Sequence, residues 1–388
     1  MMLNFTQAIP LSLYVHIPWC IKKCPYCDFN SHELEPDVTQ QQKYIDALIR
    51  DLDSFLPDIW GRQIVSVFIG GGTPSLFTVD MLNQFISALR ARLNIHPNIE
   101  ITLEANPGTA EAQKFKGYRE TGVNRLSVGV QSFNNNFLTS LGRVHDSNEA
   151  KSAVEMAKSA GFENVNIDLM FGLPGQSIEA ALDDLQQALD LQPTHISWYQ
   201  LTIEPNTVFN AKPPKLPVED LIWEIQSAGQ DLLLDYGYKQ YEVSAYAKDS
   251  LRCEHNINYW EFGDYLGIGA GAHGKITHVS EGKIMRHNQF KLPNRYIEEA
   301  GKDVASKYMI KLEDIPFEFM LNAMRLVGGI PANLFMERTG LPLNVIEDEL
   351  FLAEEKKWLD WNIQYLKPST TGQRYLNDLL QLFLPVNS

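Results

Sequence analysis

The sequence is poor in cysteine, in basic residues and in long apolar stretches. It has 388 residues but only four cysteines, and its 48 acidic against 33 basic residues give a net charge of −15. That balance argues against a general nucleic-acid surface, which needs a basic footprint. No run approaches the roughly 18 consecutive apolar residues of a membrane-spanning helix. Met1–Pro10 lacks the basic flank and apolar core of a secretory signal, so the sequence predicts a cytoplasmic protein with reduced thiols.

A strand-then-helix pattern repeats six times between residues 11 and 236. Apolar, strand-like runs cover 11–17, 64–69, 99–104, 125–130, 165–171 and 195–201. The helical patterns that follow them cover 38–56, 79–93, 110–121, 147–160, 178–191 and 218–236. Such alternation predicts a parallel sheet with right-handed crossovers, and nearly continuous apolar strands predict burial on both faces. A closed eight-unit barrel would need two further units, so the predicted fold is α/β, an open, partial (βα)6 barrel.

The segment after residue 305 has a different character. Helical patterns over 316–327, 331–339, 343–357 and 370–384 surround a hairpin-like segment at 358–366. This mixed, helix-rich unit resembles a winged-helix module, although the acidic balance argues against DNA binding. We expect a lid or docking surface over the barrel mouth, with a structural cap as the simpler interpretation. The predicted domains are 1–240 for the barrel, 241–305 for an extension and 306–388 for the C-terminal unit.

Three of the four cysteines lie in one short loop. Cys20, Cys24 and Cys27 have the spacing C-x3-C-x2-C, directly after the first apolar run. Three thiolates can hold three irons of a [4Fe–4S] cluster, one each, which leaves the fourth iron open to bind and reduce a small molecule. A structural zinc site is the alternative, and it would need a fourth ligand such as His16 or His32.

Each predicted strand ends at a polar or glycine-rich segment. Sites in βα barrels lie at the C-terminal ends of the strands, so these segments should surround one mouth. Gly70–Gly72 has no side chains, so the backbone at this position could approach a ligand closely. A tight turn between strand and helix is the alternative interpretation. Burying an unpaired carboxylate costs free energy, so we expect Glu104 and Asp168 either to face the mouth or to cap the next helix. Gln131 and Arg143 are further polar candidates for ligand contacts at this mouth. For Arg143 the alternative interpretation is a solvated charge at the start of a helix.

A second dense motif places His255, Tyr259 and Trp260 within six residues, and a glycine-rich segment after it ends in His273. Neutral imidazole is the usual proximal haem ligand, and cysteine thiolate is the main alternative. A lone histidine is more often a hydrogen-bonded structural residue, so both interpretations stay open. The cations nearest in sequence for the carboxylates of a porphyrin are Arg252, Lys275 and Arg286.

The cysteine spacing, with Tyr26 before the last cysteine, resembles that of the radical S-adenosylmethionine (SAM) enzymes. In that superfamily the open iron chelates the amino and carboxylate groups of SAM, and an electron from the cluster cleaves SAM to a 5′-deoxyadenosyl radical. From Tyr14 onward the chain resembles the coproporphyrinogen-oxidase-like branch, which contains the HemN and HemW families. The matching segments are 14–29, 70–74, 104–108, 122–133, 141–145, 168–175 and 265–273. Thr73 stands where many superfamily members have Glu.

Several features separate the chain from the HemN-type oxidases. Phe29 stands where those enzymes have a further cysteine, and the chain reaches its first strand by residue 11, without their N-terminal extension. His255-Asn256-x-x-Tyr259-Trp260 is similar to the HNxxYW signature of HemW haem chaperones. The resemblance therefore favours the HemW side of the branch.

The resemblance implies a site and a function. It implies that Cys20, Cys24 and Cys27 bind a [4Fe–4S] cluster and that His255 binds haem. The implied SAM contacts are Tyr14, Tyr26, Gly71, Gly72, Thr73, Glu104, Gln131, Arg143 and Asp168, with weaker matches at Thr202 and 272–273. The family is expected to deliver haem to haem-dependent membrane proteins such as respiratory enzymes. Oxygen-independent coproporphyrinogen III oxidase activity is the alternative. We expect no nucleic-acid partner and no transmembrane segment, and leave peripheral membrane association and a homodimer open.

Overall fold

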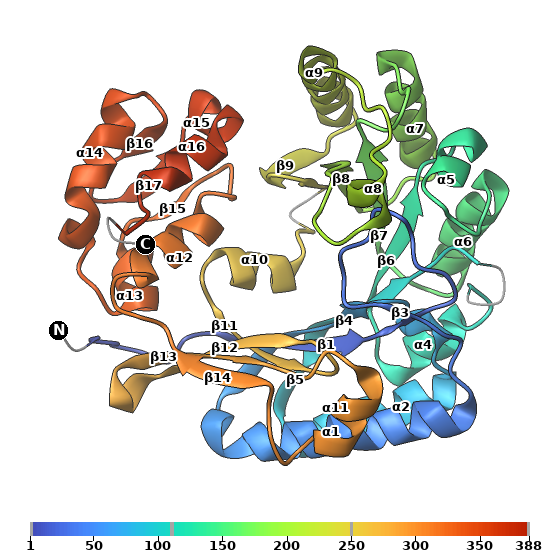
Figure 1. The fold of residues 1–388 in the computed structure, drawn as a ribbon, viewed down its shortest axis with the longest axis horizontal. Helices are drawn as coiled ribbons and strands as arrows, with labels where there is room; N and C mark the ends of the chain where they lie inside the picture. The colour runs from blue at the N-terminus through green and yellow to red at the C-terminus, as the bar shows by residue number, and fades with distance from the viewer. Residues whose placement is uncertain (1–2, 109–111, 249–250, 386–388) are drawn as a thin grey trace.

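The computed structural model describes residues 3–108, 112–248 and 251–385, and one large twisted sheet forms its centre (Figure 1). Six neighbouring strands of this sheet are parallel. They are β1 (Leu11–Ile17), β4 (Gln63–Gly71), β5 (Asn94–Ala105), β6 (Arg125–Gln131), β7 (Asn164–Phe171) and β8 (His195–Gln200). The predicted α/β fold with a partial (βα)6 barrel is therefore confirmed.

Both edges of the parallel sheet are extended by further strands. Beside β1 lies β11 (Asp264–Ile268), which is parallel to it, and then three antiparallel strands, β12 (His273–His278), β13 (Lys283–Asn288) and β14 (Ser306–Met309). Beside β8 lie β10 (Ala245–Ala247) and β9 (Lys239–Glu242), both antiparallel. The barrel is thus an open, curved sheet, twelve-stranded over the described residues.

Helices cover the outer face of the sheet, and their caps agree with the sequence. They are α1 (Val38–Ile59), α2 (Val79–Arg92), α4 (Phe115–Thr121), α5 (Asn135–Ser140), α6 (Ser147–Ser159), α7 (Ile178–Asp190) and α9 (Glu219–Asp235). Capping boxes begin α1 at Asp37 and α6 at Asp146. Residues 110 and 111 of the helix predicted over 110–121 lie outside the described residues.

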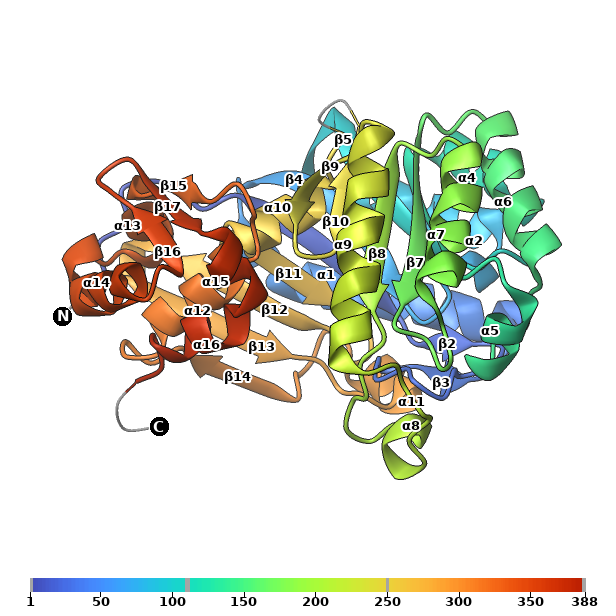
Figure 2. The ribbon, with the colours of Figure 1, turned by 90° about the horizontal axis from the view of Figure 1, so that it is seen from above.

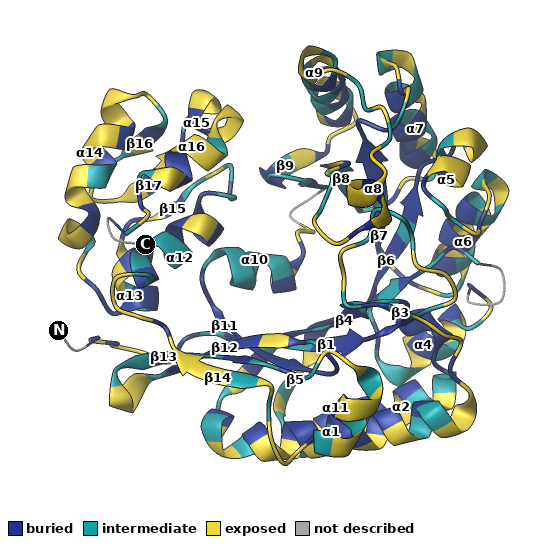
Figure 3. Ribbon diagram, viewed as in Figure 1, coloured by how far each residue is buried: buried dark blue, intermediate teal, exposed yellow. Residues whose placement is uncertain are grey.

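The apolar core lies between the sheet and these helices (Figure 3). On β1, the odd-numbered residues Leu11, Leu13 and Val15 are fully buried in this core. The even-numbered Ser12 and Tyr14 belong to the opposite face of the strand, because side chains alternate along it. That inner face of the barrel is where the polar side chains gather.

Short elements complete the barrel mouth and its interior. Near the mouth lie β2 (Trp19–Cys20), β3 (His32–Glu33), the 3₁₀ turn η1 (Pro74–Leu76), α8 (Val208–Ala211) and α11 (Pro293–Glu299). A second 3₁₀ turn, η2 (Val279–Glu281), joins β12 to β13. Helix α10 (Glu254–Trp260) packs against β4, β1 and β11, so the motif that it carries lies inside the open barrel (Figure 1).

The C-terminal unit is mixed and helix-rich, as predicted, and it supplies most of a second apolar core. It contains α12 (Ile315–Ala323), β15 (Ile330–Pro331), α13 (Asn333–Thr339), η3 (Leu343–Ile346), α14 (Glu347–Glu355), β16 (Leu359–Trp361), β17 (Tyr365–Pro368), α15 (Thr370–Arg374) and α16 (Leu376–Gln381). The predicted hairpin is present, with β15 as a third strand. The single helix predicted over 370–384 is wrong, because Tyr375 leaves helical geometry between α15 and α16.

This unit lies beside the β11–β14 edge of the sheet rather than over the barrel mouth (Figure 2). Its core includes Ile284 of β13 and Phe262 after α10. Backbone hydrogen bonds also join it to β9 and the residue after it, from Val327 N–H to the Tyr241 carbonyl and from Val243 N–H to the Arg325 carbonyl. The expected lid over the mouth is therefore wrong in this structure.

Candidate functional site

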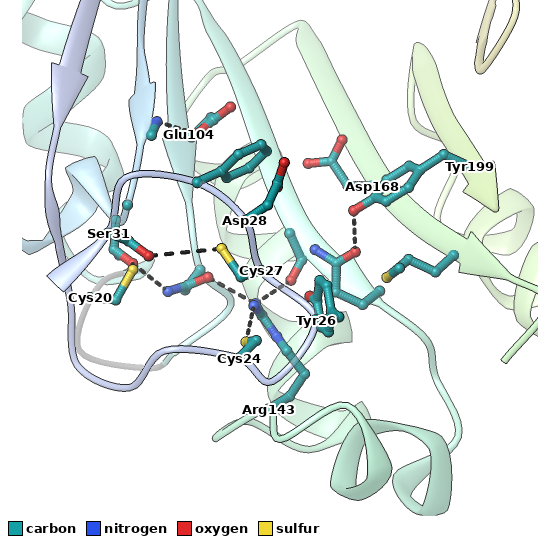
Figure 4. A pocket seen from close by; sticks show the side chains of 18 of the residues that line it. Cys20, Cys24, Tyr26, Cys27, Asp28, Ser31, Glu104, Arg143, Asp168 and Tyr199 are labelled. Carbon is teal, nitrogen blue, oxygen red and sulfur yellow. Dashed lines mark hydrogen bonds between the residues drawn. The ribbon is translucent and has the colours of Figure 1, made fainter. Parts of the chain in front are cut away.

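The cysteine loop and the ends of the parallel strands enclose a cavity of about 360 Å³ (Figure 4). Strands β5, β6, β7 and β8 contribute side chains toward their C-terminal ends, where βα barrels place their sites. The predicted residues that line this cavity are Cys20, Cys24, Tyr26, Cys27, Gly71, Gly72, Thr73, Glu104, Gln131, Arg143 and Asp168. Thr202 lines it as well, whereas Tyr14 and His255 do not.

Two of the loop thiols are hydrogen-bonded to hydroxyl groups. The Thr73 hydroxyl donates to Cys20 Sγ over 3.5 Å, and the Ser31 hydroxyl lies 3.8 Å from Cys27 Sγ. Burial raises the pKa of both thiols, while the hydroxyls oppose that rise. Donors to sulfur also tune the potential of an iron–sulfur cluster, so these hydroxyls suit thiolates that bind iron.

The third thiol contacts Arg143, whose side chain joins the cysteine loop to two strand ends. Its Nη1 donates to Cys24 Sγ over 3.6 Å, and its Nη2 donates to Asn106 Oδ1 at 2.8 Å and to the Gly129 carbonyl at 2.7 Å. Nε is buried without a partner among the described residues. Arg143 is therefore not a solvated charge at a helix start, and an unpaired donor remains on its guanidinium.

The three thiols fit a cluster better than a zinc site. Within the described residues, no group of three or more His, Cys, Asp and Glu side chains is arranged to hold one metal ion. A [4Fe–4S] cluster takes its thiolates on separate irons, so its ligands need not converge on one point. His16, one of the two suggested zinc ligands, already uses both ring nitrogens, with the Tyr14 hydroxyl and the Asn30 carbonyl each 2.9 Å away.

Glu104 and Asp168 point into the cavity, and neither caps a helix within the described part of the chain (Figure 4). Glu104 Oε2 accepts from the Gly71 N–H at 2.9 Å. Asp168 accepts from Ser127 at 2.9 Å and from Asn166 at 2.8 Å. Burial, reinforced by the neighbouring Asp168, raises the pKa of Glu104 to about 8, and burial also raises the pKa of Asp168. A ligand that carries positive charge and hydroxyl groups would restore the charged form of these carboxyls.

Gln131 occupies a bulge that turns its side chain into the cavity. Its φ of 72° lies in the left-handed region, and the register of β6 and β7 shifts between Gly129 and Gln131. Gln131 Oε1 accepts from the Tyr199 hydroxyl at 2.6 Å. Tyr199, like Asn106, lines the cavity and was missed by sequence reasoning. Its position at the end of the sixth predicted strand was the signal that could have found it.

The glycines at the end of β4 and directly after it are required by the protein's own cysteine loop. A Cβ on Gly72 would lie 2.5 Å from the Trp19 carbonyl oxygen, and Gly71 has a φ of +109°. Two hydrogen bonds hold this approach, from Gly72 N–H to the Ile17 carbonyl at 2.6 Å and from Thr73 N–H to the Trp19 carbonyl at 2.7 Å. The sequence suggested that the backbone of these glycines approaches a ligand; in this structure it approaches the backbone of the cysteine loop.

A second cavity of about 660 Å³ adjoins the first. The two share Gly71, Glu104 and part of the cysteine loop as walls. Tyr14 and His255 both line this second cavity. Its other walls include the aromatic side chains Phe29, Phe68, Tyr259, Trp260 and Tyr265.

His255 lies in the first turn of α10, 7% exposed. Its Nδ1 is 3.1 Å from the Ser66 hydroxyl, and its ring centroid is 5.1 Å from that of Phe68. Burial, with a smaller effect of Arg125, lowers the pKa of His255 to about 3. The imidazole is therefore neutral at physiological pH.

Two of the cations suggested for ligand carboxylates are engaged elsewhere. Lys275 is fully buried and pairs with Asp264 at 2.9 Å. Arg286 forms an ion pair with Glu318 and donates to the Tyr265 hydroxyl at 2.7 Å. The prediction that Lys275 and Arg286 bind ligand carboxylates is therefore wrong. Both are near the motif in sequence, but neither lines the second cavity. The lysines that line the second cavity are Lys23 and Lys291.

Comparison with known proteins agrees with this geometry. The model of the radical SAM superfamily matches residues 14–188. The heme chaperone HemW of Haemophilus influenzae is 48% identical over 97% of this chain and 98% of its own length, and that of Escherichia coli gives the same figures. The chain belongs to the HemW family. A more distant HemW, from Bacillus subtilis, is 33% identical over 86% of this chain and 88% of its own.

The HemW-family fold is shared with a solved oxidase structure. Coproporphyrinogen III oxidase HemN of Escherichia coli, a radical SAM enzyme, superposes with a TM-score of 0.80 over 97% of this chain and 90% of its own, at 23% identity. That likeness establishes the fold and not the activity. Over the residues that the structure describes, no helix is both long and apolar enough to cross a bilayer.

Proposed function

We propose that this HemW-family protein binds haem in the second cavity and passes it to haem-dependent proteins, with a [4Fe–4S] cluster and SAM in the first. The observation that carries the proposal is the position of His255, Tyr259 and Trp260 on the wall of a large cavity beside the cysteine loop. Relatives named heme chaperone that match almost the whole chain support the same function. Respiratory membrane proteins are the expected acceptors, and the free loop thiols suit the reducing cytosol.

The first cavity has the residues that a cluster and SAM would require. Cys20, Cys24 and Cys27 would hold the cluster, which supplies one electron to a ligand on its open iron. The unpaired Nε of Arg143 is a donor for the carboxylate of SAM. The carboxyl of Glu104 would bind the amino group of SAM or its ribose hydroxyls, and its position on the wall of the same cavity supports this role.

The second cavity suits a large, flat, apolar ligand with carboxylates at its edge. Its volume of about 660 Å³ is in the range of small-molecule sites, about 300–1,000 Å³. Aromatic rings such as Tyr259 and Trp260 provide apolar contact area with polar tips. Lys23 and Lys291 on its wall are suitable partners for the porphyrin propionates.

Oxidative decarboxylation of coproporphyrinogen III is the second candidate. The shared walls of the two cavities favour it, because a porphyrinogen in the second cavity would face SAM in the first. Against it stands Phe29, 58% exposed between the cavities, where the oxidases have a further cysteine.

Haem titration tests the proposed site. We expect the anaerobically purified protein to bind haem stoichiometrically, and His255→Ala to weaken binding about tenfold or more with the cluster intact. His96→Ala, which changes an exposed histidine of β5, is the matched control and should bind like the wild type. No saturable haem binding by the wild type would refute the proposal.

A further inference from the structure

A chain of buried hydrogen bonds connects the backbone of β11 to His255. The Asn258 side-chain amide lies 3.0 Å from the Asp264 carbonyl oxygen and 2.8 Å from Ser12 Oγ, both through the same atom. A carbonyl only accepts, so that atom must be the amide nitrogen. It therefore donates to Ser12 Oγ as well, and the direction of the first bonds in the chain is fixed.

The remaining bonds follow from counting protons. Ser12 Oγ is 2.7 Å from Ser66 Oγ, which is 3.1 Å from His255 Nδ1. Ser12 accepts from Asn258, and among the described residues Ser66 is the acceptor left for its own proton. Ser66 must then donate to Nδ1. The opposite direction would leave the Ser12 proton buried without an acceptor, which is unfavourable because Ser12 is 1% exposed and Ser66 fully buried.

This chain determines the tautomer of the imidazole. Nδ1 accepts a hydrogen bond, so the proton of the neutral ring is on Nε2, the ring nitrogen that makes no hydrogen bond within the described residues. Histidines that ligate metals have the opposite arrangement: one nitrogen offers its lone pair to the metal while the other donates its N–H to an acceptor. His255 therefore offers the cavity a donor and not a lone pair.

We propose that His255 binds its ligand as an N–H donor to a porphyrin carboxylate, not as a ligand to iron, and that Ser66 is the residue that positions it. This deepens the proposed function and rests on it. A carboxylate accepts from a neutral N–H, and the cavity lysines Lys23 and Lys291 supply the charge for such groups.

The iron ligand would then come from another wall of the cavity. His16 has no free nitrogen, since its two partners are the Tyr14 hydroxyl and the Asn30 carbonyl. His32 has Nε2 3.3 Å from the Lys291 carbonyl. His273, at the start of β12, is exposed and makes no side-chain hydrogen bond within the described part of the chain. It is the imidazole of this cavity with both nitrogens free.

Porphyrins with and without iron test the inference. The wild type should bind metal-free protoporphyrin IX saturably, as it binds haem, and should bind protoporphyrin dimethyl ester about tenfold or more weakly than the free acid. His255→Gln keeps an amide N–H near the position of Nε2, so it should retain binding and an unchanged haem Soret band. His255→Ala should lose affinity for both acids. His273→Ala should shift the Soret band and leave metal-free binding unchanged.

The outcomes separate this inference from the proposed function. If no porphyrin binds, the proposed function fails. If haem binds but metal-free protoporphyrin does not, and His255→Gln loses both affinity and Soret band, His255 is an iron ligand and the inference is overturned. ¹⁵N-histidine NMR of the porphyrin-free protein gives an independent readout. It should show an unprotonated Nδ1 and a protonated Nε2 for His255, with the Nδ1 signal moved by Ser66→Ala. A protonated Nδ1 would contradict the chain.

Discussion

Replacing Glu104 by Gln should change how stability depends on pH. The carboxyl has an ordinary pKa of 4.5 and a pKa of about 8 in the folded protein, chiefly because of burial. Between these values the unfolded chain has lost a proton that the folded protein retains. The free energy of unfolding must therefore fall as pH rises from about 5 to 8. Glutamine resembles the protonated acid and has no proton to lose, so this part of the slope should disappear.

The size of the effect follows from the two pKa values. A pKa that moves from 4.5 to about 8 corresponds to about 5 kcal/mol at most. Water in the cavity and the shared effect of Asp168 reduce this figure, so we expect roughly 2 kcal/mol. Between pH 5 and pH 8 the wild type should lose that much more stability than Glu104→Gln.

Urea unfolding of the cluster-free protein under reducing, anaerobic conditions measures this difference. Glu155→Gln changes an exposed carboxyl of α6 and should leave the wild-type profile unaltered. Parallel pH profiles for the wild type and Glu104→Gln would show that Glu104 is ionised like a surface residue, and the description of a protonated, desolvated carboxyl would be wrong. SAM, which brings a positive charge, should release protons from the wild type and fewer from Glu104→Gln.

Three further predictions concern the first cavity. Gly72→Ala should lower stability by about 3 kcal/mol in thermal unfolding, because its Cβ would lie 2.5 Å from the Trp19 carbonyl oxygen. Gly328→Ala is the control: a Cβ there would meet open space, so stability should change by less than about 1 kcal/mol. Replacing any one of the three loop cysteines by Ala should abolish the brown iron–sulfur chromophore, while Cys253→Ala, fully buried elsewhere, should keep it; a full chromophore without the loop thiols would disprove the cluster assignment. Arg143→Ala should weaken SAM binding about ten- to a hundredfold by calorimetry, and unchanged affinity would place the SAM carboxylate elsewhere.

The sequence predicted the barrel because its strands are buried and its helices amphipathic. Apolar runs such as Val165–Phe171 indicate the strands, and helical spacing of apolar residues, as over 38–56, indicates the helices. The rule that sites lie at strand ends then predicted that Cys20, Glu104 and Asp168 meet at one mouth. The identity of the family rested on motifs, chiefly the cysteine spacing and the His255 motif. These signals are local, so a single sequence contains them.

Contacts that depend on which face of a strand a residue occupies were harder to predict. Lys275 is near His273 in sequence, yet it points into the protein and pairs with Asp264. Tyr14 was grouped with the first cavity but lines the second. The alternation of Ser12 and Tyr14 with apolar residues along β1 was the available signal, because polar side chains at every second position mark an inner face. The helix break at Tyr375 and the partners of Ser66 depend on tertiary packing and have no such signal.

One anaerobic experiment tests the central claim most directly. The reconstituted protein is incubated with coproporphyrinogen III, reductant and SAM and analysed for protoporphyrinogen, while a parallel sample is titrated with haem. A haem chaperone should form no protoporphyrinogen and should bind haem stoichiometrically. Sustained formation of protoporphyrinogen, or the absence of saturable haem binding, would contradict it.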